Sequence, residues 1–483
     1  MDLHISLVGR GDLSGEIYRQ VRRAIVEHRL RPNDRLPPTR ELARSLRVSR
    51  MTVTVAYERL AGAGFVTPRV GAGTFVADHV TTSQAEPSRR QVQPSLRARP
   101  IWDSISPPTA LARSAPFDFR TGVADVSAFP FDAWRRHMDR QWRASSIETG
   151  TYAGPAGHPR LREAIAHHLG VARGIDVSSD DVLITNGTQQ ALDVVARTLL
   201  SPGDRVAVED PGYQAPRRLL RSLGIDVRGT PVDREGIVVD ALPAASRLVL
   251  VTPSHQYPLG VVLSLRRRHA LLEWADRNDA AILEDDYDSE FRFAGRPVEP
   301  LKTLDTSDRV IYVGTFSKTM LPTLRLGFLV MPPTIAEAAR TAKSVSDWHT
   351  SMPIQAALAA FIDEGGFARH IRKMRSVYQE RHEMITDLIG RDFAGTLDLV
   401  PSMAGLHVAA LASDAGAIDG IADAAIRAGV AIQELSWFTQ DVEPAHGLLF
   451  GYGGIATSKI PEGVRLLQRS LGRLDRRGRT TDP

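Results

Sequence analysis

Residues 309–330 read RVIYVGTFSKTMLPTLRLGFLV, and this stretch carries the clearest signal of the fold. Its two apolar runs, 310–313 and 327–330, are short and continuous, which is typical of strands buried on both faces of a sheet. The polar segment between them places Lys318 shortly after the first run. A lysine at the end of a buried strand loses hydration, and this favours the neutral, nucleophilic amine.

Four further apolar runs of the same kind lie upstream, at 182–185, 206–209, 248–251 and 281–284, with helical patterns between them. Strands that alternate with helices predict an α/β domain with a mostly parallel sheet. From about residue 390 the pattern becomes less regular, which predicts a smaller C-terminal lobe. We therefore expect one α/β domain over residues 115–475.

A carboxylate pair ends the run 281–284, at the sheet edge where α/β proteins bind ligands. Asp285 and Asp286 are followed by Tyr287. A carboxylate at this edge can hold a protonated ring nitrogen, and the phenol beside it can contact a ring hydroxyl. We assign the ring nitrogen to Asp285, with Asp286 as the alternative, and the hydroxyl to Tyr287.

A phosphate-binding pattern follows the run 182–185. A phosphate group needs backbone amides at a helix N-terminus and a cation. The sequence NGTQQ at 186–190 opens a helix directly after the strand. The candidate phosphate ligands are Gly187, Thr188 and Gln189, the guanidinium of Arg325, and the hydroxyl of Thr315 or Ser317.

An aromatic residue that can cover a ring stands in EDPGY, at Tyr213. A reactive lysine, a carboxylate for a ring nitrogen, a phosphate cradle and a ring cover thus occur in order, each at a strand end. This combination predicts a site for pyridoxal 5′-phosphate that Lys318 holds as an internal aldimine, a Schiff base. In fold-type I enzymes of this cofactor, the stretch PSHQYPLG would place His255 and Tyr257 near the ring hydroxyl.

The N-terminal segment differs in charge from the rest of the chain. Residues 1–76 contain 13 Arg, no Lys and 7 acidic residues, a net charge of +6 against +4 for the whole chain. A basic segment on a near-neutral body indicates a polyanionic partner. Helical spacing predicts a helix from Ser14, its candidate N-cap, and two more after residues 38 and 48. Two short strands at 65–67 and 74–76 complete a winged helix-turn-helix.

In a helix-turn-helix, the second helix of the pair enters the major groove of DNA. Arg50 can form a bidentate contact to guanine, and hydroxyls in the same turn can contact phosphate or a thymine methyl group. Arg40 is placed for a phosphate, and the wing for the minor groove. The candidate DNA-binding residues are Arg40, Ser49, Arg50, Thr52, Thr54, Arg69, Gly71 and Gly73.

Residues 32–76 resemble the DNA-binding domain of the GntR superfamily. Together with TNGTQQALD, EDPGY, TPSHQYPLG, EDDYDSEF and GTFSK, they make the chain similar to the MocR/GabR subfamily of GntR-type transcriptional regulators over nearly its full length. The resemblance implies a winged helix-turn-helix at 1–78, a linker at 79–114 and an aminotransferase-like effector domain at 115–475. It also implies a head-to-tail homodimer, a double-stranded DNA operator and a small-molecule effector, which is the cofactor itself, an amine or an amino acid.

The chain departs from the aminotransferase pattern at one position of consequence. Enzymes of this fold place an arginine near the C-terminus to hold the substrate carboxylate, and the corresponding residues 445–452 contain none. The GABA-sensing member has a second arginine where this chain has Ala215, and Arg217 is out of register. This departure favours the cofactor itself as the signal, as in PdxR-type regulators of vitamin B6 synthesis.

Two other functions are compatible with the motifs: an aminotransferase with an appended DNA-binding domain, and a dimerisation scaffold without cofactor. A residual transaminase half-reaction is compatible with the regulator as well. The chain has no cysteine, which excludes disulfides, thiolate catalysis and cysteine zinc sites, and we expect no metal. Without a membrane-spanning apolar run or a secretory leader, we expect a cytoplasmic protein that does not contact membranes. Operator, target genes and sign of regulation are left open.

Overall fold

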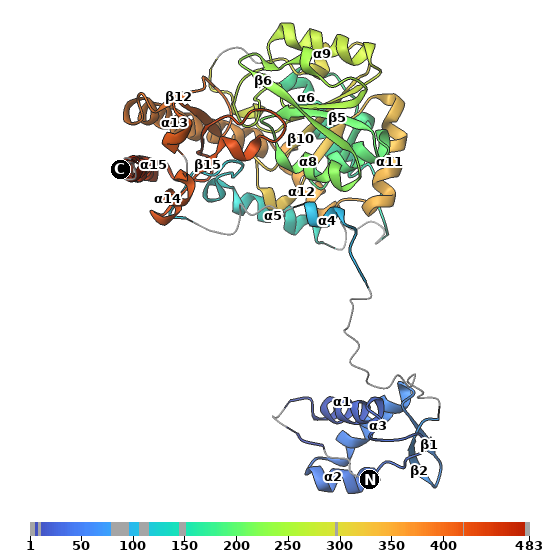
Figure 1. Ribbon diagram of the computed structural model, residues 1–483. Coiled ribbons are helices and arrows are strands. Elements are labelled where there is room, and N and C mark those ends of the chain that lie inside the picture. Colours follow the sequence, from blue (N-terminus) through green and yellow to red (C-terminus); the bar gives the residue numbers. More distant parts are fainter. Residues whose placement is uncertain are drawn as a thin grey trace. The chain divides into compact units, whose positions relative to one another are not determined.

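The computed structural model describes residues 5–7, 11–78, 96–105, 115–143, 151–294, 298–418 and 420–478. The chain forms two compact units, residues 1–98 and 99–483 (Figure 1). Most of the expected linker, residues 79–95 and 106–114, lies outside the described residues, and the part between contains the short helix α4 (Ile101–Ser104). No helix of the described part is long and apolar enough to cross a membrane.

The first unit has the predicted order of three helices and a hairpin. These are α1 (Leu13–Val26), α2 (Thr39–Leu46), α3 (Arg50–Gly62), β1 (Val66–Arg69) and β2 (Gly73–Val76). The two strands pair antiparallel, and one apolar core joins all five elements. The cap of α1 was predicted wrongly. Asp12 accepts the hydrogen bond from the Gly15 amide at 2.8 Å, because the helix begins one residue before Ser14.

The second unit is built on an eight-stranded sheet with the order β4-β11-β10-β9-β8-β5-β6-β7. The strands from β10 to β6 in this order run parallel, and β11 and β7 run antiparallel to their neighbours. The predicted, largely parallel sheet is therefore present. Its strands are β4 (Val182–Thr185), β5 (Arg205–Asp210), β6 (Asp226–Asp233), β7 (Gly236–Ile237), β8 (Ser246–Val251), β9 (Ala281–Asp286), β10 (Val310–Thr315) and β11 (Gly327–Val330).

Helices cover both faces of this sheet. Leu183 and Val313 face α7, α8 and α11, whereas the neighbouring Ile184 and Tyr312 face the side covered by α6 and α12. Successive strand residues are thus buried on opposite faces, which explains the continuous apolar runs. The helices are α5 (Phe131–Gln141), α6 (Pro159–Arg173), α7 (Thr188–Leu199), α8 (Gln214–Ser222), α9 (Leu265–Arg277), α10 (Leu301–Leu304), α11 (Pro333–Asp347), α12 (Met352–Asp363) and α13 (Gly366–Asp392).

A smaller lobe follows α13, as the sequence predicted. Its four-stranded antiparallel sheet has the order β12-β13-β16-β15. A segment that precedes the large sheet in sequence also belongs to this lobe, since β3 (Phe117–Asp118) and β14 (Val430–Ala431) form a separate parallel pair there. The lobe is therefore assembled from both ends of the body. Its other elements are β12 (Leu397–Leu399), β13 (His407–Ala412), α14 (Ile421–Arg427), β15 (Gln433–Glu434), β16 (Gly447–Gly451) and α15 (Ile460–Gly478).

Candidate functional site

A cavity of about 430 Å³ lies at the carboxyl ends of β4, β5, β9 and β10. Ten of the twelve residues that the sequence predicted as ligand contacts line it. The other two lie just behind the wall: Gly187 packs against Arg325, and His255 binds Asp288. The lining residues among those predicted are Thr188, Gln189, Tyr213, Tyr257, Asp285, Tyr287, Thr315, Ser317, Lys318 and Arg325.

Lys318 lies in the loop that follows β10, and its Nζ atom donates a hydrogen bond to the carbonyl oxygen of Gly122 at 2.7 Å. Burial lowers the pKa of Lys318, although attraction to Asp288 and Asp285 opposes this. Gly122 has φ of +82°, and a Cβ atom there would lie 3.3 Å from Nζ. The site therefore holds a desolvated amine with little room around it.

The two acidic candidates at the end of β9 have different surroundings. Asp286 accepts hydrogen bonds from Arg173 at 2.7 Å and from the Tyr312 hydroxyl at 2.6 Å, and it does not line the cavity. Asp285 does, and its buried Oδ1 atom has no hydrogen-bond partner within the described residues. Burial, with repulsion from Asp286, raises the pKa of Asp285 to about 7. Of the two, Asp285 is the carboxylate available to a ligand.

A helix N-terminus and an arginine meet at the cavity wall where α7 begins. Gly187 is the N-cap residue of α7, with φ of +75°, and Arg325 donates to the carbonyl oxygen of Asn186 at 2.9 Å. A Cβ atom at position 187 would lie 3.0 Å from the Arg325 guanidinium. Glycine thus lets a cation approach the free amides of a helix N-terminus, an arrangement that attracts phosphate groups. The Asn186 side-chain amide donates a hydrogen bond to Asp347 at 2.7 Å, and this bond fixes the loop between β4 and α7.

Aromatic and hydroxyl groups form the remaining walls. Tyr213, which is 40% exposed, packs edge-on against Tyr257, with 5.9 Å between ring centroids. The Tyr257 hydroxyl lies 2.6 Å from the Thr121 hydroxyl, which in turn donates to Gln433 Oε1 at 2.9 Å. Burial raises the pKa of Tyr257, so its hydroxyl stays protonated. These walls offer an aromatic face and uncharged hydrogen-bonding groups.

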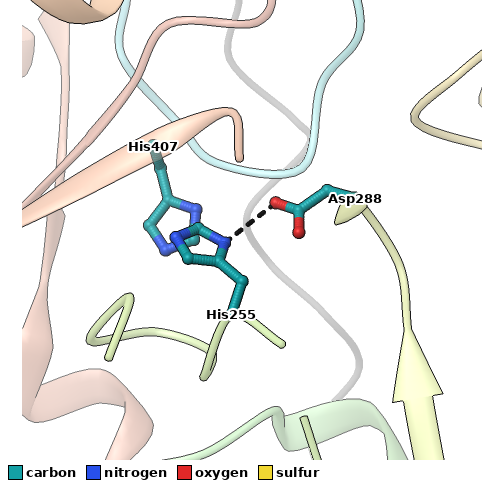
Figure 2. Close-up of side chains that lie close together, drawn as sticks. All are labelled: His255, Asp288 and His407. Atoms are coloured by element: carbon teal, nitrogen blue, oxygen red, sulfur yellow. Dashed lines mark hydrogen bonds and ion pairs between the residues drawn. The ribbon is translucent and has the colours of Figure 1, made fainter. Parts of the chain in front are cut away.

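His255, Asp288 and His407 form a buried cluster (Figure 2), and Asp288 and His407 line the cavity. His255 Nδ1 lies 3.0 Å from Asp288 Oδ2 and 3.1 Å from the Tyr287 hydroxyl. The three residues are of types that bind metal ions. However, the imidazole rings lie 4.9 Å apart in a tilted contact, and His407 Nε2 donates to the carbonyl oxygen of Pro258. One ligand atom from each of the three residues lies within 4.8 Å of the other two, and His255 Nδ1 also contacts the Tyr287 hydroxyl.

Several cavity residues were not predicted from the sequence: Thr121, Gly122, Thr252, Asp288, Pro322, Leu406, His407 and Gln433. Thr121 follows β3, and His407 and Gln433 belong to strands of the small lobe. None of these three follows a long apolar run of the large sheet, so strand-end reasoning could not find them. Asp288 could have been found, because it follows Tyr287 in the same motif.

Arg217, the arginine that the sequence places out of register for a substrate carboxylate, has a structural role. Arg217 is fully buried and forms ion pairs with Asp210 at 3.2 Å and Asp441 at 3.1 Å. It is therefore unavailable to a ligand. Among the described residues that line the cavity, Arg325 is the only arginine. The stretch 445–452, where the enzymes have theirs, forms β16, and its Gly451 pairs with His407.

In the first unit, the predicted DNA contacts divide into exposed groups and groups with structural roles. Arg40 and Arg50 are exposed, and Arg50 Nε lies 3.4 Å from the Thr39 hydroxyl. Ser49 caps α3 by accepting from the Thr52 amide, and the Thr54 hydroxyl donates to the Arg50 carbonyl oxygen.

The wing of the first unit is ordered by its arginines. Arg69 donates to Asn33 Oδ1 at 2.8 Å and lies over the Phe75 ring. Gly73 leaves room for Arg35, since a Cβ atom at position 73 would lie 3.0 Å from the Arg35 guanidinium. Gly71 has open space and φ of +75°, which a tight turn requires. The exposed tip of the wing is Val70.

Comparison with known proteins matches both units. Residues 13–76 match the family of bacterial regulatory proteins named gntR, and residues 118–440 match aminotransferase class I and II. The body is similar to a solved kynurenine aminotransferase of Pyrococcus horikoshii, with a TM-score of 0.70, 27% identity, and coverage of 78% of this chain and 95% of that one.

Curated relatives extend over nearly the whole chain. The probable rhizopine catabolism regulatory protein MocR of Rhizobium meliloti is 38% identical over 96% of this chain and 94% of its own length. The pyridoxine biosynthesis transcriptional regulator PdxR of Corynebacterium glutamicum is 33% identical over 91% of each chain.

A winged helix-turn-helix joined to an aminotransferase-like body defines a DNA-binding transcriptional regulator with an aminotransferase-like sensor domain. The chain belongs to the MocR/GabR subfamily of GntR-type transcriptional regulators.

Proposed function

We propose that the body of this regulator binds pyridoxal 5′-phosphate through Lys318, and that occupancy of the cavity controls how a homodimer binds its operator. The observation that carries the proposal is the presence, in one cavity, of a desolvated Lys318 and the buried, unpartnered Oδ1 atom of Asp285. A buried carboxylate oxygen without a partner is costly. A protonated ring nitrogen would satisfy it.

The residues present fit this cofactor at each of its polar groups. Arg325 and the first amides of α7 would hold the phosphate, with Thr315 and Ser317 supplying hydroxyls. Tyr287 lies on the cavity wall; its hydroxyl donates to the His255 carbonyl oxygen and can accept a hydrogen bond from a ring hydroxyl. The ring itself would lie against Tyr213, whose aromatic face borders the same space.

Each side chain has a defined task in holding the cofactor. When bound, pyridoxal 5′-phosphate supplies an aldehyde carbon that reacts with amines and a ring that withdraws electrons. Lys318 Nζ would bind that carbon, and the lowering of its pKa by burial favours the neutral amine that this requires. Asp285 would keep the ring nitrogen protonated. Gly187 would give the phosphate access to Arg325.

Binding of the cofactor acts as a signal only if the protein has two conformations with different affinities for it. We infer that the two conformations differ in how the heads of the dimer present α3 to DNA, with Arg50 in the major groove and Arg40 at a phosphate. The cofactor itself is the simplest signal, since the described residues that line the cavity include no second arginine for an amino acid. The Corynebacterium glutamicum relative is named a regulator of pyridoxine biosynthesis, which supports pyridoxal 5′-phosphate as the signal. DNA as partner places the protein in the cytoplasm.

An aminotransferase with an appended DNA-binding domain is the weaker proposal. Holding an α-amino acid for turnover requires a cation at its carboxylate. Arg217 is paired with two carboxylates, and Arg325 lies at the phosphate corner. The relatives that cover the whole chain are named as regulators rather than enzymes.

Absorbance spectroscopy tests the proposal. Pyridoxal 5′-phosphate bound through Lys318 should produce a band near ~420 nm, and Lys318→Ala should abolish it. Lys373→Ala is the matched control, because Lys373 lies on the exposed side of α13. A band of equal strength in Lys318→Ala would refute the assignment. Sequence-specific retention of DNA, measured beside turnover of common amino donors, separates a regulator from an enzyme.

A further inference from the structure

One wall of the cavity is made of uncharged hydrogen-bonding groups, of which only Tyr257 was predicted to contact the cofactor. It consists of Thr121, Tyr257, His407 and Gln433, here called the amide–hydroxyl wall. Thr121 follows β3, and His407 and Gln433 belong to β13 and β15 of the small lobe, whereas Asp285 and Lys318 lie at strand ends of the large sheet. Gly122, the residue after Thr121, accepts a hydrogen bond from Lys318 Nζ at 2.7 Å, so the wall borders the space beside the reactive amine.

The hydrogen bonds of this wall fix which atoms remain for a ligand. Gln433 Oε1 accepts from both the amide and the hydroxyl of Thr121, at 2.8 and 2.9 Å. Because the Thr121 proton is used there, the Tyr257 hydroxyl must donate to Thr121 across 2.6 Å. Gln433 Nε2 has no partner among the described residues, so the wall offers an amide donor beside hydroxyl oxygens that accept.

The wall carries no positive charge. Burial, together with repulsion from His255, holds the pKa of His407 well below its ordinary value, so the imidazole is neutral. Lys318 and Arg325 are the cavity's cations in the part of the chain described, and the proposed function commits both to the cofactor. Asp288 also lines the cavity, with a carboxylate oxygen within 4.8 Å of a His407 ring nitrogen, and a carboxylate there attracts a cation and repels an anion.

We propose that this wall is a subsite for the hydroxyl-bearing part of a small primary amine without a carboxylate, an amino alcohol. The amine would lie toward Lys318 and Asp288, and its hydroxyls would bind Gln433 and Thr121. A carboxylate at the wall would be buried without a cation, which costs several kcal/mol. The inference rests on the proposed function, because it places the ligand beside the bound cofactor.

Two probes with the same carbon skeleton test the proposal. Serinol, 2-amino-1,3-propanediol, differs from L-serine only in a hydroxymethyl group where serine has the carboxylate. Calorimetric titration of the full-length protein loaded with pyridoxal 5′-phosphate should show serinol binding at least about tenfold more tightly than serine. Equal or tighter binding of serine, or no binding of either probe, would overturn the proposal.

Variants of Gln433 sharpen the test. Gln433→Leu removes the amide donor and should weaken serinol binding by about tenfold. Gln433→Arg supplies the missing cation and should make serine the tighter ligand. Gln379→Leu, on α13 and outside the cavity lining, is the control. An unchanged order of affinities in Gln433→Arg would contradict the role of this residue.

Cofactor loading separates the two proposals. The band near ~420 nm is recorded before each titration. A parent protein that takes up no cofactor would refute the proposed function. A loaded protein that prefers serine would refute only the amino-alcohol subsite. If a Gln433 variant fails to fold, the comparison of serinol with serine on the parent protein still decides the matter.

Discussion

Gly187 shows how one missing side chain can create a binding corner. Its φ of +75° and the approach of Arg325 both require glycine. Gly187→Ala should therefore displace the guanidinium and weaken binding of pyridoxal 5′-phosphate by about tenfold or more. Gly203→Ala is the control, because Gly203 has φ of +95° but open space around it. Titration of the ~420 nm band measures both. Equal losses of affinity would mean that backbone strain, rather than the phosphate corner, is responsible.

Asp285 links the cofactor site to pH. Burial, followed by repulsion from Asp286, raises its pKa from 3.8 to about 7. Between these values the folded chain holds a proton that the unfolded chain has lost, so this group's contribution to stability falls as the pH rises. Asparagine is neutral at every pH. The stability advantage of Asp285→Asn over the cofactor-free parent should therefore grow by roughly 2–3 kcal/mol from pH 5 to pH 8.

Urea unfolding at both pH values measures this difference. Asp240→Asn is the control, since Asp240 is exposed on the surface of the body. Its effect should be the same at pH 5 and pH 8. An advantage of Asp285→Asn that did not change with pH would mean that the carboxylate is already ionised and compensated in the cofactor-free protein.

At the scale of elements, helix α3 carries the expected specificity for DNA. Arg50→Ala should remove a bidentate base contact and relax specificity at one base pair by about 1–3 kcal/mol. Arg40→Ala, at the start of α2, should weaken binding to all sequences and lower the salt slope by about one. Competition binding over a series of operator variants and salt concentrations distinguishes the two. If both variants bind as the parent does, α3 does not dock in the predicted way.

The sequence predicted the central strands well because their residues are buried on both faces. The bounds of β4 and β11 agree to the residue, and β9 and β10 run only two residues further than predicted. The missed strands β6 and β7 lie at the edge of the sheet, where β6 has only two buried residues, mixed with exposed and half-buried ones, and lacks a continuous apolar run. Burial on one side leaves a weaker pattern in the sequence.

The candidate site was predictable only in part, for a related reason. The residues at strand ends, such as Lys318 and Asp285, follow from the topology of parallel sheets. The sequence could not decide between Asp285 and Asp286. The decision depends on the hydrogen bond that Arg173, at the end of α6, donates to Asp286. Gln433 belongs to a strand of two residues, and no periodicity marks so short an element. Contacts between distant segments of the chain thus account for what the sequence did not show.

At the scale of the whole molecule, Lys318 connects the large sheet to the segment that enters the body. Its Nζ atom donates to Gly122, four residues after β3, and β3 pairs with β14 of the small lobe. In sequence, this segment directly follows the expected linker to the DNA-binding unit. If Lys318 holds the cofactor as proposed, its hydrogen bond to Gly122 would change on binding. The proposed function would then act on the part of the body nearest in sequence to the head.

This connection predicts that DNA protection depends on Lys318. A dimer should protect two half-sites in the DNA upstream of its own gene, and pyridoxal 5′-phosphate should change the extent or affinity of that protection. Lys318→Ala should still bind this DNA, because its two heads are intact, but its footprint should not respond to the cofactor. Footprinting of parent and variant, with and without the cofactor, measures both properties. A parent footprint that is the same in both conditions would show that the body does not transmit occupancy to the heads, whatever the cavity binds.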